Sequence, residues 1–291
     1  MSISVKPDRI FFCLTSGRSG TTYLSSLIRN NIAEITCKHE PQPDGFGKAL
    51  LWHQQGELAK VANRFKKKCW RINNCGTQAY IETNHAFLKT FSDLAIEAYP
   101  DLKLFHLMRD PLKVARSEAN RELDADRIHF PMRRLKLPNG TTSFRWSFTG
   151  LEPIFKQCPL ENMSLFQFYV LQWIEVENRA MHFLDRHDKH GDCFNIHTPI
   201  DFNDPDKVEA LLRFMDLPRK KPNADAPSKG GNQNHNLTPT VITDTDEAEF
   251  QEVIAATPGS YLEIFHKAPY DAFPWADILR CGGSAEAEFS A

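Results

Sequence analysis

The sequence predicts an α/β fold with three layers, in which helices flank both faces of a central parallel sheet. Three segments carry this prediction, because each pairs a short apolar run with a helical pattern: residues 10–28, 102–123 and 192–216. Short apolar runs bounded by turn residues are typical of buried strands, and strands that alternate with helices favour a parallel sheet. Ligands bind at the carboxyl ends of such strands, so the residues that follow each strand are candidates for a functional site.

The first strand, Ile10–Leu14, leads into a loop of small and hydroxyl residues. Apolar residues at helical spacing from Tyr23 to Ile28 indicate that a helix follows this loop. The order of strand, loop and helix aims backbone N–H groups and a helix N-terminus at one point, which suits an anion. We therefore predict a phosphate-binding loop with one permanent positive charge, formed by Gly17, Arg18, Ser19, Gly20, Thr21 and Thr22.

This loop departs from the one that binds ATP or GTP, G-x-x-x-x-G-K-[ST]. When Gly20 is aligned with the second glycine, Thr21 stands in place of the lysine and Thr15 in place of the first glycine. Residues 18–22, Arg-Ser-Gly-Thr-Thr, resemble instead the 5′-phosphosulfate loop of sulfotransferases, whose core is basic–Ser/Gly–Gly–Thr–Thr/Ser. For the loop alone, the alternative is an ordinary turn between a strand and a helix.

A second motif follows another predicted strand, Leu102–Met108. Arg109 comes directly after this strand, Asp110 and Pro111 suit the cap and the first position of a helix, and Ser117 lies eight residues after Arg109. Sulfotransferases carry a motif of this form, whose arginine and serine hold the 3′-phosphate of 3′-phosphoadenosine 5′-phosphosulfate (PAPS). By itself the motif could be a capped helix with an exposed arginine, but the two motifs together favour the sulfotransferase family.

The resemblance implies a P-loop-like fold and the transfer of a sulfuryl group from PAPS to a hydroxyl or amine of a small-molecule or carbohydrate acceptor. Adenosine 3′,5′-bisphosphate (PAP) would be released, and no metal ion would be needed because the sulfuryl group carries a single charge. Arg18 would stabilise the departing oxygen as a permanent cation and hydrogen-bond donor. The alternatives are a P-loop kinase that uses ATP and Mg²⁺, and a nucleotide-binding protein without catalysis.

Three residues at or just beyond predicted strand ends are candidates for the catalytic base. Glu40 follows a short predicted strand at 34–37 and lies twenty-two residues after Arg18, whereas Glu82 and His85 belong to a strand at 78–85. Sulfotransferases place a catalytic carboxylate either shortly after the loop helix, which Glu40 matches, or at the strand end before the second motif, which Glu82 matches. We expect Glu40 to be the base, Glu82 a second catalytic or acceptor-orienting group, and His85 the third candidate. Taken alone, the alternative for Glu40 is an exposed loop carboxylate, and the alternative for His85, slightly favoured, is a histidine at a helix start.

Amphipathic patterns predict further helices at 46–70, 86–98, 164–187, 204–216 and 244–256. Three lysines, 66–68, stand near the end of the first of these, and basic residues complement a helix C-terminus. We interpret them as a solvent-exposed face, with binding of an acidic acceptor as the alternative.

Two later segments differ from the regular pattern. Residues 126–162 are rich in proline, arginine and aromatic residues, and we interpret them as an acceptor-binding lid, with a structural cover over the sheet edge as the alternative. Lys229 and Gly230 lie in a polar loop that resembles the late basic-Lys-Gly loop with which cytosolic sulfotransferases close over the nucleotide; a plain surface loop is the alternative. With no repeat or linker apparent, we expect residues 1–291 to form one sulfotransferase domain.

Composition limits the partners. The formal net charge of −2 gives no general case for binding nucleic acid. Seven cysteines without a Cys-x-x-Cys motif suggest free thiols in a reducing compartment. We find neither a long apolar run nor a signal-peptide pattern, so we expect no membrane span and a cytoplasmic location.

Overall fold

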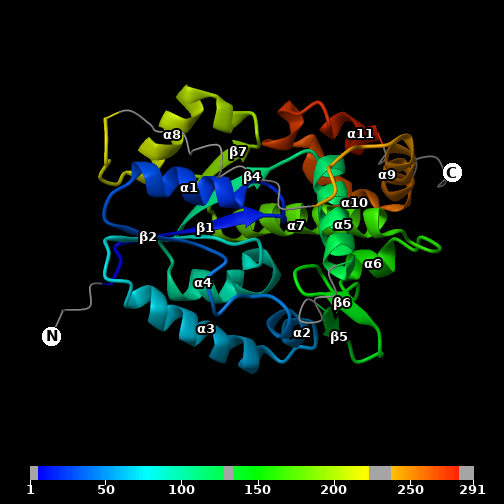
Figure 1. The fold of residues 1–291 in the computed structure, drawn as a ribbon, viewed down its shortest axis with the longest axis horizontal. Helices are drawn as coiled ribbons and strands as arrows, with labels where there is room; N and C mark the ends of the chain where they lie inside the picture. The colour runs from blue at the N-terminus through cyan, green and yellow to red at the C-terminus, as the bar shows by residue number, and fades with distance from the viewer. Residues whose placement is uncertain (1–5, 128–133, 223–236, 282–291) are drawn as a thin grey trace. The chain divides into compact units, whose positions relative to one another are not determined.

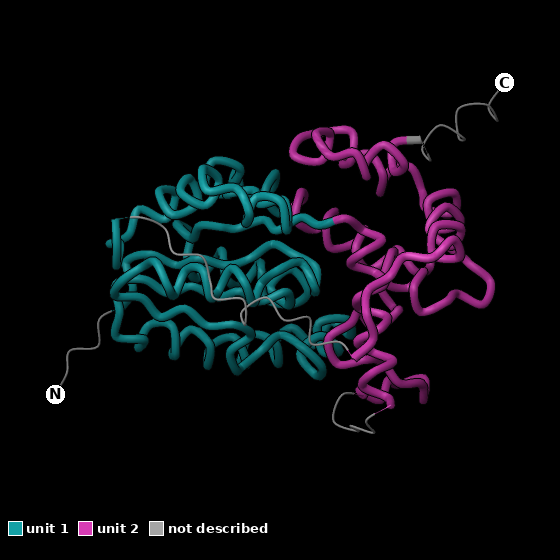
Figure 2. Tube along the Cα trace, turned by 45° about the horizontal axis from the view of Figure 1, so that its top comes forward, with its two compact units in different colours: residues 1–109, 183–234 teal, residues 110–182, 235–291 magenta. Residues whose placement is uncertain are grey.

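A computed structural model describes residues 6–127, 134–222 and 237–281 of the chain. The chain divides into two compact units, Met1–Arg109 with Phe183–Asn234 and Asp110–His182 with His235–Ala291 (Figure 2). Each unit therefore draws on two separate segments of sequence. The expectation of one domain across residues 1–291 stays a prediction.

The first unit contains a sheet of five strands in the order β2-β3-β1-β4-β7, and all four strand pairs are parallel. The strands are β1 (Arg9–Thr15), β2 (Ile35–His39), β3 (Ala79–Thr83), β4 (Lys103–Met108) and β7 (Cys193–His197). Because every strand runs in the same direction, all five carboxyl ends lie along one edge of the sheet.

Helices cover both faces of this sheet, which confirms the predicted three-layer α/β fold. Figure 1 shows α1 (Thr21–Asn31) and α8 (Pro205–Met215) over one face and α3 (Leu58–Asn73) and α4 (Ser92–Ala98) over the other. Successive side chains of β1 point to opposite faces of the sheet, so the strand packs against both helical layers. Phe11 belongs to the apolar cluster that includes Leu27 of α1 and Leu211 of α8, whereas Phe12 stacks on Phe87 with ring centroids 4.8 Å apart.

Two predicted helices are interrupted. The single helix expected at 46–70 is wrong: α2 (Lys48–Gln54) ends before Gly56, whose φ of 72° no helix accommodates, and α3 begins at Leu58. The helix expected at 86–98 begins as a π-helical turn, η1 (Phe87–Phe91), before α4 continues it. Such turns are rare and often occur beside functional sites.

The second unit is mostly helical. Its helices include α5 (Pro111–Arg127), α6 (Pro153–Gln157), α9 (Asp244–Ala256), α10 (Gly259–Leu262) and α11 (Ala276–Cys281), and α7 (Leu165–His187) begins in it. Asp110 caps α5 as predicted, since its Oδ1 accepts the N–H of Leu112 at 3.0 Å. The unit has its own aromatic core, in which Trp173 stacks on Phe265 at 5.2 Å and on the edge of Trp275 at 5.5 Å.

The segment at 126–162 has more regular structure than expected. It contains an antiparallel hairpin of β5 (Arg134–Lys136) and β6 (Thr142–Phe144), followed by α6. The chain also continues past the predicted helix at 244–256 into α10, α11 and short 3₁₀ turns, η5 (Glu263–His266) and η6 (Tyr270–Ala272). These elements are too short to show a helical period in the sequence.

No helix within the described ranges is both long and apolar enough to cross a membrane. The cysteines whose side chains the structure describes are all free thiols, as the sequence predicts: Cys13, Cys37, Cys69, Cys75, Cys158 and Cys193.

Candidate functional site

The predicted phosphate-binding loop, residues 17–22, joins β1 to α1, and its backbone suits an anion site. Arg18 and Gly20 adopt left-handed φ angles of 63° and 97°, a conformation that gathers successive N–H groups into a concave nest. Gly20 also caps α1, and a Cβ atom there would lie 3.1 Å from the ring of Phe202, so this position requires glycine. The first turn of α1 holds no acidic residue, so no carboxylate of that turn offsets the positive end of the helix dipole.

Hydroxyl groups brace the loop. The Oγ atoms of Ser16 and Ser19 lie 3.0 Å apart, and Thr22 Oγ1 lies 3.2 Å from His39 Nε2. Among the loop residues, the structure buries Gly17, Ser19 and Thr21 and leaves Arg18, Gly20 and Thr22 half-buried.

Arg109 connects the second motif to this loop. It follows β4, which pairs directly with β1, and its Nη1 donates to the backbone oxygen of Arg18 at 2.5 Å. The two arginines that the sequence assigns to separate motifs therefore meet at the carboxyl ends of adjacent strands. Ser117 lies buried on α5, in the second compact unit.

Glu40 and His85, two of the three candidate bases, lie together. His85 Nε2 is 3.3 Å from Glu40 Oε1, although Glu40 follows β2 and His85 follows β3. The His85 side chain is almost completely buried, at 2% exposed, whereas the Glu40 side chain is 24% exposed. The ring of His85 packs on Phe46 with centroids 4.6 Å apart, which fixes one face of the imidazole.

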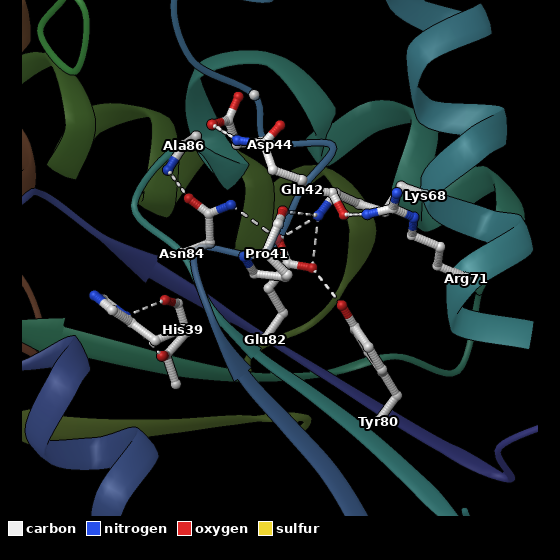
Figure 3. Close-up of polar contacts among 12 residues, drawn as sticks. His39, Pro41, Gln42, Asp44, Lys68, Arg71, Tyr80, Glu82, Asn84 and Ala86 are labelled. Carbon is white, nitrogen blue, oxygen red and sulfur yellow. Dashed lines mark hydrogen bonds and ion pairs between the residues drawn. The ribbon is translucent and has the colours of Figure 1, made fainter. Parts of the chain in front are cut away.

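The third candidate, Glu82, occupies a closed polar network (Figure 3). Lys68 Nζ donates to both carboxylate oxygens at 2.7 Å, Tyr80 OH donates to Oε2 at 2.8 Å, and Asn84 Nδ2 donates to Oε1 at 2.9 Å. Tyr80, Glu82 and Asn84 converge because alternate residues of a strand share one face. Burial, reinforced by the negative charge of Glu82, raises the pKa of Tyr80 well above its usual value, so its phenol stays a donor.

Lys68 corrects the sequence interpretation of the three lysines. Lys66 and Lys67 are exposed as expected, but Lys68 is 1% exposed. It lies on the buried face of α3 together with Val61, Phe65 and Ile72. These four residues are spaced so that they lie on one face of the helix, and this spacing could have distinguished the buried Lys68 from the exposed Lys66 and Lys67.

His39 is a further residue that the sequence interpretation did not assign. Its Nδ1 lies 2.9 Å from the backbone oxygen of Thr83; because a carbonyl oxygen only accepts, Nδ1 carries a proton. Its Nε2 faces both Thr22 Oγ1 of the phosphate-binding loop, at 3.2 Å, and Glu40 Oε1, at 3.9 Å. His39 thus links the predicted phosphate-binding loop to the Glu40–His85 pair along one edge of the sheet.

Two other expectations concern the donor. Lys229 and Gly230 lie outside the described residues. Among the side chains that the structure does describe, no group of three or more His, Cys, Asp or Glu residues is arranged to hold a metal ion.

Comparison of the sequence with models of known protein families finds no match, and comparison with curated proteins also finds none. The fold resembles a sulfotransferase from Alicyclobacillus acidocaldarius, with a TM-score of 0.49 and 16% identity over 90% of this chain and 97% of that chain. It also resembles the sulfotransferase domain of the curacin biosynthetic pathway, with a TM-score of 0.44 and 13% identity over 96% of this chain and 98% of that chain. A mouse sulfotransferase, SULT7A1 complexed with PAP, gives a TM-score of 0.43 and 14% identity over 96% of this chain and 89% of that chain. With identities and TM-scores this low, the likeness by itself carries no conclusion about activity.

Proposed function

We propose that this chain is a PAPS-dependent sulfotransferase, which transfers a sulfuryl group to a hydroxyl or amine of a small-molecule or carbohydrate acceptor and releases PAP. The observation that carries the proposal is the junction of the two motifs, where Arg109 Nη1 lies 2.5 Å from the backbone oxygen of Arg18. A nest of N–H groups beside a second arginine suits a nucleotide that bears phosphates at both its 5′ and 3′ positions.

The transfer breaks the bond between sulfur and the bridging oxygen of PAPS and forms a bond between sulfur and the acceptor oxygen or nitrogen. The electron pair of the broken bond stays on the bridging oxygen, which leaves as part of PAP. Arg18 and the loop N–H groups stabilise the negative charge that develops on this oxygen. As in phosphoryl transfer, positioning and charge stabilisation supply most of the rate.

In this proposal the proton of the acceptor passes to Glu40. The Glu40 carboxylate is 24% exposed, whereas the side chains of Glu82 and His85 are each 2% exposed, so of the three Glu40 is best placed to reach an acceptor. Glu82 has a different role, because a carboxylate has about four lone-pair positions and Lys68, Tyr80 and Asn84 fill those of Glu82. We therefore assign Glu82 to positioning and His85 to orienting Glu40.

Two other functions fit the fold less well. A kinase that uses ATP and Mg²⁺ needs the lysine of the ATP loop, and Thr21 stands in that place. A nucleotide-binding protein without catalysis has no use for a carboxylate held against a buried histidine, as Glu40 is held against His85.

Incubation with PAPS radiolabelled in its sulfuryl group, together with a panel of phenols, sugars and amines, tests the proposal. We expect label to move to an acceptor as PAP forms in equal amount. Arg18→Ala should lower kcat by about 10²-fold or more, the scale of a lost oxyanion donor, while PAP affinity changes less. Arg18→Lys should keep part of the activity because it keeps the charge. Undiminished turnover by Arg18→Ala, or no PAP formation by the wild type, would contradict the proposal.

A further inference from the structure

Lys68 makes one contact beyond its ion pair with Glu82. Its Nζ also donates to the backbone oxygen of Pro41 at 3.3 Å, so one ammonium group joins helix α3, strand β3 and the segment that follows β2 (Figure 3). Proline has no N–H, so this carbonyl is the only backbone polar group through which Pro41 can be held. Replacing a buried ion pair with apolar residues often leaves stability unchanged or raises it. A contribution to stability is therefore a weak explanation for a buried lysine at position 68.

The residue before Pro41 is Glu40, whose backbone is unusual. Its φ of 44° lies in the left-handed region, which a residue other than glycine keeps only when its surroundings hold it there. Two contacts flank this residue. The Glu40 N–H donates to the Thr83 oxygen at 3.4 Å on one side, and Lys68 holds the Pro41 oxygen on the other.

The same face of α3 holds the next residues of this segment. Arg71 donates to the backbone oxygen of Gln42, and Arg64 Nε donates to the backbone oxygen of Asp44 at 2.8 Å. The segment then reaches Phe46, whose ring packs on His85. Residues 41–46, which we call the clamp segment, therefore connect α3 to both members of the Glu40–His85 pair.

We propose that Lys68 is a positioning residue, which fixes the clamp segment through Pro41 and so holds the Glu40 carboxylate against His85. Glu82, Tyr80 and Asn84 hold the ammonium group in place, and Glu82 balances its charge in the interior. The inference rests on the proposed role of Glu40 as base, but the placement of the clamp segment can be measured without any activity.

The experiment compares the full chain with Glu82→Gln, Lys68→Met/Glu82→Gln and Lys67→Met. The double variant removes both buried charges together and the bond to Pro41, whereas Glu82→Gln alone keeps that bond. Lys67→Met is the matched control, because Lys67 is the exposed neighbour on the same helix. Hydrogen exchange is followed by mass spectrometry in peptides that cover residues 40–46 and 16–23. PAP affinity is measured by calorimetry, and kcat and KM are measured with PAPS and the acceptor identified in the panel above.

In the double variant we expect the amides of 40–46 to exchange about tenfold faster or more, while 16–23 and PAP affinity stay as in the wild type. The value of kcat should fall about tenfold or more with KM for PAPS unchanged, because a misplaced base slows chemistry without weakening nucleotide binding. Lys67→Met should keep wild-type exchange in 40–46. Glu82→Gln removes the charge that balances Lys68 but keeps the bond to Pro41, so it should raise exchange in 40–46 less than the double variant does. If the double variant does not fold, Lys68→Leu/Glu82→Leu, which also removes the donor to Pro41, replaces it with the same expectation.

Unchanged exchange in 40–46 in the double variant would overturn the inference, and so would a lower melting temperature with undiminished kcat, since that pattern describes a purely structural lysine. If the wild type neither binds PAP nor consumes PAPS, the proposed function fails instead, and the exchange comparison still decides whether Lys68 fixes the backbone beside Glu40.

Discussion

Glu40 and Glu82 stand at the ends of neighbouring strands, yet their surroundings give them different chemistry. A general base needs a lone pair that is open to the proton it accepts. Glu82 directs its oxygens at three donors inside the protein, and its side chain is 2% exposed. The Glu40 side chain is 24% exposed, and on its buried side His85 Nε2 lies 3.3 Å from Glu40 Oε1.

Glu40→Gln should therefore slow the chemical step by about 10²-fold or more, the usual scale for a general base. His85→Asn should have a smaller effect, because this change disturbs only the orientation of Glu40. The measurement is single-turnover transfer from PAPS, with nucleotide binding confirmed by titration. A normal rate for Glu40→Gln together with a slow rate for Glu82→Gln or His85→Asn would move the base to that residue.

Arg109→Ala should weaken binding of PAP much more than binding of 5′-AMP. In the proposed function Arg109 holds the 3′-phosphate, which 5′-AMP lacks, and a hydrogen bond to a charged group contributes about 1.5–3 kcal/mol. Calorimetric titration of both nucleotides against the wild type and the variant measures the difference. Because Arg109 also donates to the Arg18 oxygen, some loss is expected for both ligands; an equal loss would mean that Arg109 acts only through the loop.

Single residues were predictable where backbone chemistry demands one residue type. Gly20, with its positive φ beside Phe202, and Asp110, which caps α5, behave as their positions in the sequence indicate. The burial of Lys68 was not predicted, because three consecutive lysines look alike in the sequence. Only the position of each lysine around the helix axis distinguishes the buried Lys68 from its exposed neighbours. The contacts of His39 were not predicted for another reason. Its partners Thr22 and Thr83 belong to segments that are distant in sequence and come together only in the fold.

At the scale of elements, the clamp segment lies between α3 and the π-helical turn η1. Thr90 of η1 donates through Oγ1 to the Gly45 oxygen at 3.2 Å. A Cβ atom on Gly45 would lie only 2.1 Å from that Oγ1 and 3.1 Å from the Cβ of Ala86. Gly45 is therefore required by close packing, since a methyl group there would displace either the clamp segment or η1.

Gly45→Ala should accordingly lower the free energy of unfolding by about 1–3 kcal/mol, the usual cost of overpacking. Gly191→Ala is the matched control, because nothing lies within 4 Å of its would-be Cβ, and it should change stability by less than about 0.5 kcal/mol. Urea unfolding measures both. The penalty for Gly45→Ala should shrink in a Thr90→Ala background; an equal penalty in both backgrounds would show that Thr90 is not the obstacle.

Strands and long helices were predictable because their apolar periods extend over several residues, as in β1, β4 and α8. The break between α2 and α3 was not, although Gly56 marks it, because a single glycine inside a helical pattern is often tolerated. The π-helical turn has no sequence period of its own, since it continues directly into α4.

At the scale of the whole molecule, the candidate site depends on strand order. Arg18 and Arg109 are far apart in sequence and meet because β4 pairs directly with β1. Each strand placed between them would have moved the two loops apart by about 4.8 Å. The sequence predicts parallel strands but not their order, because buried strands present similar apolar runs whatever their neighbours. The meeting of the two motifs is therefore a finding of the structure.

The change in the melting temperature of the protein on adding different nucleotides should show which nucleotide the candidate site prefers. A ligand that binds only the folded protein raises the free energy of unfolding by RT ln(1 + [L]/Kd), about 2.7 kcal/mol at a hundredfold excess over Kd. We expect a loop with Arg18 inside it and Arg109 beside it to favour PAP, whereas a kinase would favour ATP with Mg²⁺. We expect PAP to raise the melting temperature by several degrees at concentrations where ATP–Mg²⁺ and 5′-AMP raise it little, and Arg109→Ala to remove most of the preference for PAP over 5′-AMP. A larger shift with ATP–Mg²⁺ would favour the kinase, and no shift with any of the three would mean that these motifs do not form a nucleotide site.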